Sequence, residues 1–234
     1  MVHRQMRLTE ELVSLVPPYC GESGKLAGRA DLPSDAEYAG AVKEVLEGAP
    51  PSGDVWIFAY GSLIWNPGFE HVEERLGTLS GWRRSFCQGW VRIYRGTPER
   101  PGIMLALDRG GSCRGVVFRL SPEAVDENLT LLLRRERPIR WETLGVRWVT
   151  ARTDAGPVRA LAFPISRSHA SYLPDLTEDV VVEALATAAG ERGSMAEYLR
   201  STVEHLEARG IHDRYLWRMQ ERVAERLDRG SFAN

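Results

Sequence analysis

A run of short strand-like segments between residues 55 and 165 most constrains how this chain can fold. Turn signals rich in Gly, Pro, Asn and Asp separate the segments, and Gly110-Gly111 is expected to form a hairpin turn. One helical segment, Ser121 to Arg137, interrupts the series. This order predicts an α+β fold, a small mixed β-barrel or strongly curved sheet with a helix packed on it. The expected strands are VWIFAY, RRSFCQGWVRIY, IMLALD, CRGVVFRL, LGVRWVTAR and VRALAFPI.

Helical segments flank the strand region on both sides. Before it, LTEELVSLV carries a threonine cap, a second helix is expected from Ser34 to Leu46, and GAPPSGD has the composition of a linker. After it come LTEDVVVEALATAAG with a C-cap glycine, SMAEYLRSTVEHLEARG with a serine cap and terminal Gly210, and HDRYLWRMQERVAERLDRG. We therefore predict a helical extension and linker over residues 1–53 and one domain over residues 54–234. Its barrel would span about 54–170, and its helical C-terminus about 171–234.

Composition and charge narrow the class of protein. Apolar residues make up 43% and charged residues 26%, as in ordinary globular proteins. The 30 basic and 32 acidic residues give a net charge of −2 without a basic run, so nucleic acid is not an expected partner. Neither a membrane-spanning segment nor an export signal is evident, and three widely spaced cysteines fit reduced thiols. We expect a cytoplasmic protein with no membrane partner, of undetermined oligomeric state.

The inserted helix places a carboxylate on its apolar face. Ser121 is expected to cap this helix, and Pro122 suits its first position. At about 100° per residue, Glu136 lies only about 20° from Val125, whereas Arg134 points to the opposite side and the neighbouring arginines are expected to point outward. Pro138 should end the helix. The remaining members of the apolar stripe are Leu129, Leu132 and Leu133.

Two interpretations of Glu136 remain open on these grounds. A carboxylate on a buried face is costly unless it is paired or protonated, and desolvation raises its pKa into the range that a general base needs. Alternatively, the last helical turn frays, and Glu136 reaches solvent or pairs with an arginine. Glu142 is a rival carboxylate, but it lies in a polar segment and is expected to be exposed.

The sequence AYGSLIWN raises a second candidate site. A strand-like run stops at Gly61-Ser62, and apolar residues follow at once. Glycine allows a ligand to approach the backbone closely, and successive N–H groups with the Ser62 hydroxyl can bind a carboxylate or an amine. An ordinary strand-end turn would look the same over four residues.

Other candidates are weaker. Arg95, in RGTP, could bind an anion or lie in an exposed turn. Cys87 could be a nucleophile, but it fits a small buried strand residue better, because no histidine lies near it in the sequence. No metal-ligand spacing is formed by the five histidines, which are His3, His71, His169, His205 and His212.

Several of these stretches, in this order, resemble the ChaC-type γ-glutamylcyclotransferases. The matching segments are VWIFAYGSLIWNP, GTLSGWRRSFCQG, RGTPERPGIMLAL, GVVFRL, LTLLLRRE and AEYLRSTVEHLEARGIHD, and they extend from about Val55 to Asp213. YGSL alone would be a weak signal, but YGSLIWNP, RGTPERPG and a helix ending in RRE are specific in combination.

The resemblance implies a compact mixed barrel surrounded by helices, and an enzyme that converts glutathione to 5-oxoproline and cysteinylglycine without metal or cofactor. It implies that the loop of Tyr60, Gly61, Ser62 and Leu63 holds the γ-glutamyl group. It also implies that the catalytic carboxylate is Glu136, the residue that helical geometry had singled out. We also expect Arg95 and Tyr172 to bind this small-molecule substrate.

The segment after Glu136 departs from the bacterial pattern, which continues with a glycine and a tyrosine. Here Arg137-Pro138-Ile139-Arg140-Trp141-Glu142 follows, which puts the substrate in doubt more than the reaction. Three alternatives stay open: a cyclotransferase for another γ-glutamyl amine, a non-catalytic γ-glutamyl binding module, and a thiol-dependent hydrolase that uses Cys87.

Overall fold

The computed structural model of the chain describes residues 5–19, 32–136 and 145–231. These residues form two compact units, between which the chain passes along two long strands. The barrel unit comprises the described residues of Leu26–Ser85 and Ala106–Tyr172, and the helical unit those of Met1–Lys25, Phe86–Leu105 and Leu173–Asn234. Within the described residues, no helix is long and apolar enough to cross a bilayer. The predicted boundary between residues 53 and 54 stays a prediction.

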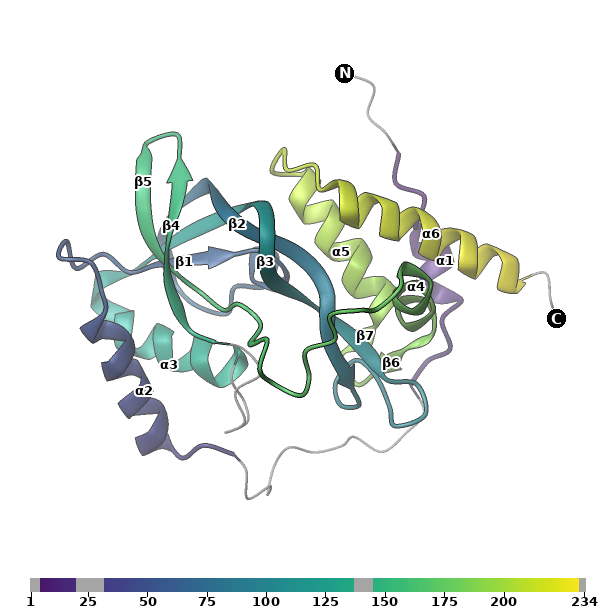
Figure 1. The fold of residues 1–234 in the computed structure, drawn as a ribbon, viewed down its shortest axis with the longest axis horizontal. Helices are drawn as coiled ribbons and strands as arrows, with labels where there is room; N and C mark the ends of the chain where they lie inside the picture. The colour runs from purple at the N-terminus through teal and green to yellow at the C-terminus, as the bar shows by residue number, and fades with distance from the viewer. Residues whose placement is uncertain (1–4, 20–31, 137–144, 232–234) are drawn as a thin grey trace. The chain divides into compact units, whose positions relative to one another are not determined.

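The predicted barrel is confirmed: five strands close in the order β1-β3-β2-β4-β5 (Figure 1). β1 (Trp56–Ala59) lies antiparallel to β3 (Gly102–Leu120), with Ala59 opposite Val116, and parallel to β5 (Gly156–Ala162), with Ile57 opposite Leu161. β4 (Arg147–Thr153) and β5 form a hairpin, and Gly156 has φ 103° there. The strand-rich sequence therefore closes on itself and leaves β1 with a neighbour on both edges.

One predicted turn is wrong. Gly110-Gly111 does not reverse the chain, because β3 continues through both glycines and joins the expected strands IMLALD and CRGVVFRL. The two residues do have positive φ, 108° and 68°. Glycines in this conformation also accommodate bends and bulges inside a strand that stays paired. β2 (His71–Val91) is likewise longer than expected, since it begins well before RRSFCQGWVRIY.

The barrel interior combines large side chains from β1, β2 and β3 with small ones from the β4–β5 hairpin. Trp56, Phe58 and Tyr60 contribute from β1 and the residue after it, while the hairpin contributes Ala151, Ala160 and Ala162. Small residues leave the volume that the aromatic rings need in a close-packed interior. The remaining members of this core are Leu79, Trp82, Leu107, Cys113 and Val117.

The inserted helix is confirmed as a short 3₁₀ turn (η2, Pro122–Ala124) that leads into α3 (Val125–Glu136). Leu129, Leu132 and Leu133 are buried as predicted. Ser121 occupies the predicted N-cap position, with Pro122 at the start of the helix, but its hydroxyl donates to Glu123 Oε2 at 2.6 Å and makes no capping bond. The predicted helix stop at Pro138 lies outside the described residues.

Contacts with Glu70 and with α2 hold α3 in the barrel unit. Buried Asn128 on α3 accepts a hydrogen bond from the backbone N–H of Glu70 at 2.9 Å. α2 (Asp35–Glu47) begins at the predicted Ser34, which forms a capping box with Glu37, and packs beside α3 (Figure 1). These contacts fix α3 to its neighbours in the barrel unit.

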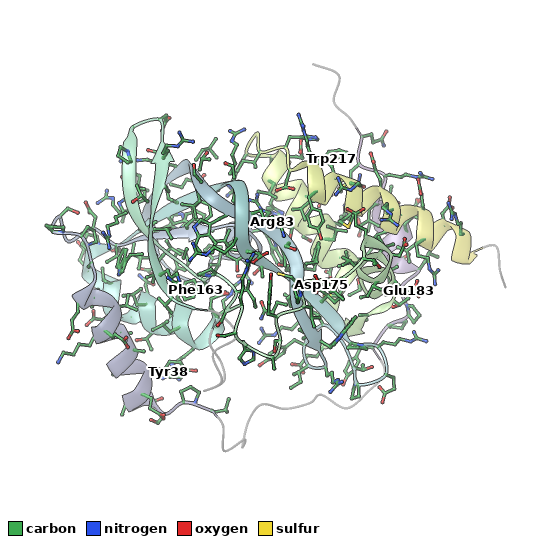
Figure 2. The ribbon with its side chains drawn as sticks, viewed as in Figure 1. Tyr38, Arg83, Phe163, Asp175, Glu183 and Trp217 are labelled. Carbon is green, nitrogen blue, oxygen red and sulfur yellow. The ribbon has the colours of Figure 1, made fainter. Side chains whose placement is uncertain are left out.

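The helical unit holds the C-terminal helices predicted from sequence. α4 (Glu178–Thr187), α5 (Met195–Glu207) and α6 (Arg214–Ser231) pack against one another, and α1 (Glu10–Ser14) lies against α5 and α6. Arginines of α6 pair with acidic residues of α4, as Arg226 does with Glu183, which Figure 2 labels. The predicted caps Thr9, Ser194 and Gly210 are found.

The glycine cap expected at the end of α4 is wrong. This helix ends at Thr187 with Ala188 as its C-cap, and Gly190 lies in β6 (Ala189–Gly190), which pairs with β7 (Gly193–Ser194). A Cβ at Gly190 would collide with the carbonyl oxygen of Tyr94. A close backbone approach therefore requires this glycine, rather than a helix end.

Gly115 on β3 lies close to β1, so a substitution at Gly115 tests how tightly these two strands pack. A Cβ there would lie 2.8 Å from Phe58 Cζ and would also overlap the carbonyl oxygen of Ala59. We predict that Gly115→Ala lowers the free energy of unfolding by about 1–3 kcal/mol, the usual cost of overpacking. Thermal melts followed by circular dichroism measure this.

Gly40→Ala on α2 is the control, because Gly40 is exposed and a Cβ there meets nothing within 4 Å. Alanine favours a helix over glycine by about 1 kcal/mol, so this variant should be neutral or more stable. Equal stability of the two variants would show that β3 can move away from β1 at little cost.

Candidate active site

The strand β1 ends directly at the YGSL motif. A single 3₁₀ turn, η1 (Ser62–Ile64), follows Gly61, and the Ile64 N–H donates to the Gly61 carbonyl at 2.9 Å. Leu63 and Ile64 are 4% and 2% exposed, so the chain returns to the core at once. This confirms the predicted strand end and explains the apolar residues after it, which hold the turn in place.

Two side chains anchor the residue before the turn. The Tyr60 hydroxyl donates to the carbonyl oxygen of Phe163 at 3.0 Å, and Figure 2 labels Phe163. Arg84, only 5% exposed, donates through Nε to the Tyr60 carbonyl at 2.6 Å and through Nη2 to the Arg114 carbonyl. Sequence analysis missed Arg84, although an arginine within an apolar strand segment is a signal, because a buried charge needs partners.

Glu136 occupies the last turn of α3 and is largely buried. Its side chain is 16% exposed, and its Oε1 lies 3.1 Å from Nε of Arg135. Each of the two open interpretations therefore describes part of the site: the carboxylate is withdrawn from solvent, and it pairs with an arginine.

Burial and the ion pair act on Glu136 in opposite directions. Removal from water raises the pKa of the carboxyl, and the charge and hydrogen bond of Arg135 lower it. Burial is the larger effect, so the pKa of Glu136 lies above its ordinary value. A carboxylate with a raised pKa is a better proton acceptor near neutral pH than an exposed one.

The two arginines before Glu136 behave differently. Arg134 points away as predicted: its Nη2 lies 2.7 Å from Asp35 Oδ1, and its guanidinium lies over the ring of Tyr38, labelled in Figure 2. The expectation that Arg135 also points outward is wrong. Arg135 is 24% exposed and donates to Ser62 Oγ at 3.0 Å. The structure thus brings Ser62 and Glu136 together through a residue that sequence analysis did not select.

Tyr172 belongs to a separate cluster of the barrel unit, which forms around the buried Asp108. Its hydroxyl donates to Oδ2 of Asp108 at 3.4 Å, and Asp108 also meets Arg167 at 2.8 Å and Arg83 at 3.4 Å. Burial would raise the pKa of Asp108, but the hydrogen bonds from Arg167 and the Arg109 N–H, with the charges of Arg167 and Arg83, hold it below its usual value. Asp108 therefore stays ionised and restrains the ring of Tyr172.

Arg95 lies in the helical unit, whereas the other predicted site residues lie in the barrel unit. Its side chain is 14% exposed, donates to the Ser194 carbonyl at 2.9 Å and lies 3.7 Å from Glu197 Oε2. Burial lowers the pKa of this guanidinium. Its predicted role in binding substrate stays a prediction.

The weaker candidates gain no support. Cys87 is 3% exposed and lies in β2. Across residues 5–19, 32–136 and 145–231, no group of His, Cys, Asp and Glu is arranged to hold a metal ion. Glu142 and the altered segment from Arg137 lie outside the described residues.

A model of ChaC-like proteins matches residues 55–226 of this chain. The chain belongs to the ChaC-like protein family. The match covers both the YGSL turn and Glu136, in agreement with the resemblance drawn from the sequence motifs. The residues before it include α1 and α2, so these helices lie outside the matched region.

Named relatives agree with this assignment. The glutathione-specific gamma-glutamylcyclotransferase of Escherichia coli (strain K12) is 39% identical over 181 residues, which are 77% of this chain and 77% of that protein. Glutathione-specific gamma-glutamylcyclotransferase 1 of Mus musculus is 32% identical over 159 residues, 67% of this chain and 71% of that one. A crystal structure of a yeast gamma-glutamyl cyclotransferase specific to glutathione has a TM-score of 0.66 at 20% identity and covers 74% of this chain and 96% of that one. The structural match supports the fold alone.

The raised pKa of Glu136 predicts how stability depends on pH. The ionised carboxylate is disfavoured in the folded state, so this penalty is absent below the ordinary glutamate pKa and complete above the raised one. We expect Glu136→Gln to be more stable than the unaltered ChaC-like protein at neutral pH. The advantage should fade as pH falls through the raised pKa. Thermal melts of both proteins from acid to neutral pH measure this.

Glu178→Gln is the control with the opposite sign. Hydrogen bonds from Arg218 lower the pKa of Glu178, so its stabilising contribution is present at neutral pH and is lost in acid. This variant should be less stable than the unaltered protein at neutral pH. If both variants shifted stability in the same direction, the burial of Glu136 would not be the dominant influence on its charge.

Proposed function

We propose that this ChaC-like protein cleaves glutathione to 5-oxoproline and cysteinylglycine. The observation that carries the proposal is the buried Glu136 carboxylate with its raised pKa, joined to the YGSL turn through Arg135. The E. coli and mouse relatives, both glutathione-specific gamma-glutamylcyclotransferases by name, support the same substrate.

The reaction is an intramolecular attack within the γ-glutamyl group. The α-amino nitrogen forms a bond to the γ-carbonyl carbon and closes a five-membered lactam, while the bond from that carbon to the cysteine nitrogen breaks. Both reacting atoms belong to one substrate, so the protein gains most by holding the chain in the folded-back conformation. A rigid turn that grips the α-carboxylate end does this.

Glu136 would move the proton that this attack requires. The α-ammonium nitrogen loses one proton before it attacks and a second as the lactam N–H forms, and the departing nitrogen of cysteinylglycine gains one as it leaves and a second as it becomes an ammonium group. Glu136 accepts the first proton and returns it to the leaving nitrogen, so no net acid or base is consumed. Its raised pKa makes the carboxylate a stronger base for the first step, and the carboxylic acid formed there is still far more acidic than the amine that it protonates in the second.

The YGSL turn would hold the γ-glutamyl end. Tyr60 and Leu63 are buried and anchor the turn, which leaves the backbone of Gly61 and Ser62 and the Ser62 hydroxyl to bind substrate. Arg95 and Tyr172 stay proposed substrate ligands. The Tyr172 hydroxyl is restrained by Asp108, and Arg95 is held by Ser194 and Glu197. A cytoplasmic location also remains a proposal.

The sequence left open another γ-glutamyl amine as substrate, because the residues after Glu136 differ from the bacterial pattern, and the names of the E. coli and mouse relatives favour glutathione instead. Incubation with glutathione, oxidised glutathione and γ-Glu-Ala, with 5-oxoproline quantified, decides between them. If the protein released 5-oxoproline faster from γ-Glu-Ala than from glutathione, the proposed substrate would be wrong and the proposed reaction would still hold. A non-catalytic binding module is disfavoured, since Glu136 is retained in a buried position.

Glu136→Gln tests the assigned base directly. The amide is nearly isosteric but cannot accept the proton, so we expect kcat for 5-oxoproline release to fall by about 10²-fold or more. Glu127→Gln is the matched control, because Glu127 is an exposed glutamate on the same helix, and it should keep full activity. Retention of more than about a tenth of kcat by Glu136→Gln, on the same scale, would remove Glu136 from the mechanism.

Cys87→Ala separates this mechanism from a thiol-dependent hydrolase. Cys87 is buried, and the proposed reaction has no covalent enzyme intermediate, so the variant should keep its kcat after correction for folded protein. Thermal melts give the folded fraction, because removal of a buried side chain lowers stability. Loss of 5-oxoproline release in a fully folded Cys87→Ala protein would favour the thiol mechanism.

A further inference from the structure

The guanidinium of Arg135 contacts Glu136, the YGSL turn and the residues that follow this turn. Its Nε lies 3.1 Å from Glu136 Oε1, and its Nη2 donates to Ser62 Oγ at 3.0 Å. Its Nη1 donates to the carbonyl oxygens of Asn66 and Pro67, the latter at 3.3 Å. The Arg135 side chain thus joins the end of α3 to the YGSL turn and to the segment that follows it.

We propose that Arg135 is a positioning residue that holds the YGSL turn and the segment that follows it, Asn66-Pro67-Gly68, to the Glu136 carboxylate. The inference rests on the proposed function, in which the turn holds the γ-glutamyl group and Glu136 moves the proton. Neither the sequence motifs nor the family membership gives Arg135 or this following segment such a role.

The geometry uses the shape of the guanidinium. Arginine presents its N–H donors in a rigid planar fork, so it can hold several acceptors in fixed relative positions. The segment Asn66-Pro67-Gly68 lies close to this group, since a Cβ at Gly68, whose φ is 68°, would lie 3.4 Å from Nη1. Lysine keeps the charge, but its single nitrogen cannot hold the same set of acceptors.

The contact with Ser62 also gives the serine hydroxyl a direction. Its oxygen accepts a hydrogen bond from Arg135, so the hydroxyl hydrogen is available for a different partner. In the proposed complex that partner is the α-carboxylate of the γ-glutamyl group. Arg135 therefore acts on substrate binding through Ser62, without touching the substrate.

The contact with Glu136 acts on proton transfer. Burial favours the protonated carboxyl, and a base that is already protonated cannot accept the α-ammonium proton. Arg135 opposes this and is the charged neighbour that acts on Glu136 among the described residues. The other groups that contact this guanidinium are neutral: the Ser62 hydroxyl and the carbonyl oxygens of Asn66 and Pro67. Arg135 therefore keeps the buried base ionised over a wider pH range.

The test separates the two contacts by kinetics. In Arg135→Met we expect the acid limb of kcat/KM to move to higher pH, and KM to rise about 10-fold through loss of a charged hydrogen bond. In Arg135→Lys the acid limb of kcat/KM should stay near that of the unaltered enzyme, because the positive charge is kept. KM should still rise, because lysine cannot hold the same set of acceptors. Ser62→Ala should raise KM about 5-fold and leave the limb unmoved.

Arg134→Met is the matched control. Arg134 has the same charge, lies next to Arg135 on α3 and pairs with exposed Asp35, so neither KM nor the acid limb should change. Thermal melts of all variants report folding. A purely structural role for Arg135 would lower stability and active fraction, and it would leave the pH profile of the remaining enzyme unchanged.

A readout without catalysis makes failure of this inference distinguishable from failure of the proposed function. The side-chain carboxyl carbon of Glu136, assigned by its loss in Glu136→Gln, can be titrated by ¹³C NMR in the unaltered protein and in Arg135→Met. An upward shift in Arg135→Met supports the contact with Glu136 even if no 5-oxoproline is formed. Unchanged titration, or unchanged KM in a protein that does form 5-oxoproline, would overturn the inference.

Discussion

The position of β1 is the constraint on which the rest of the barrel unit depends. This strand has a hydrogen-bonded neighbour on each edge, and all four of its residues are buried. A strand held in this way cannot slide, because a shift by one residue would exchange the side chains of its two faces. The point at which the chain leaves the barrel is therefore set by Ala59 and its partner Val116. The YGSL turn takes its place from that register, and Arg84 and the Tyr60 hydroxyl hold it there.

The second determinant is the placement of charge at the end of α3. A buried carboxylate is tolerated only when its surroundings compensate for the lost water, and here Arg135 compensates in part. The same guanidinium donates hydrogen bonds to Ser62 and to the carbonyl oxygen of Pro67. Arg135 therefore fixes the position of the YGSL turn relative to Glu136, in addition to its effect on the charge of Glu136. Asp108 shows the opposite balance, because two arginines and a backbone N–H outweigh the effect of its burial. Two buried carboxyl groups in one unit thus have pKa values displaced in opposite directions.

Sequence patterns predicted elements better than they predicted the use of individual glycines and caps. The barrel strands, the inserted helix and the C-terminal helices were expected from periodicity and turn signals, and the structure contains them. Gly110-Gly111 was misassigned because positive φ serves both a turn and a bend in a paired strand. Gly190 was misassigned because close backbone packing, visible only in three dimensions, also demands glycine. The Ser121 hydroxyl found a nearer partner in Glu123.

The sequence by itself determined that a strand-rich region carries an amphipathic helix with Glu136 on its apolar face, since these follow from local periodicity. It also determined the family, because the motifs YGSLIWNP, RGTPERPG and RRE occur in order. Only the tertiary structure decided which arginine faces the carboxylate. Helical geometry gives the direction in which a side chain leaves the helix, but long side chains follow the acceptors available to them. The acceptors of Arg135 lie about 70 residues away in sequence, at Ser62, Asn66 and Pro67, and barrel closure brings them to the end of α3.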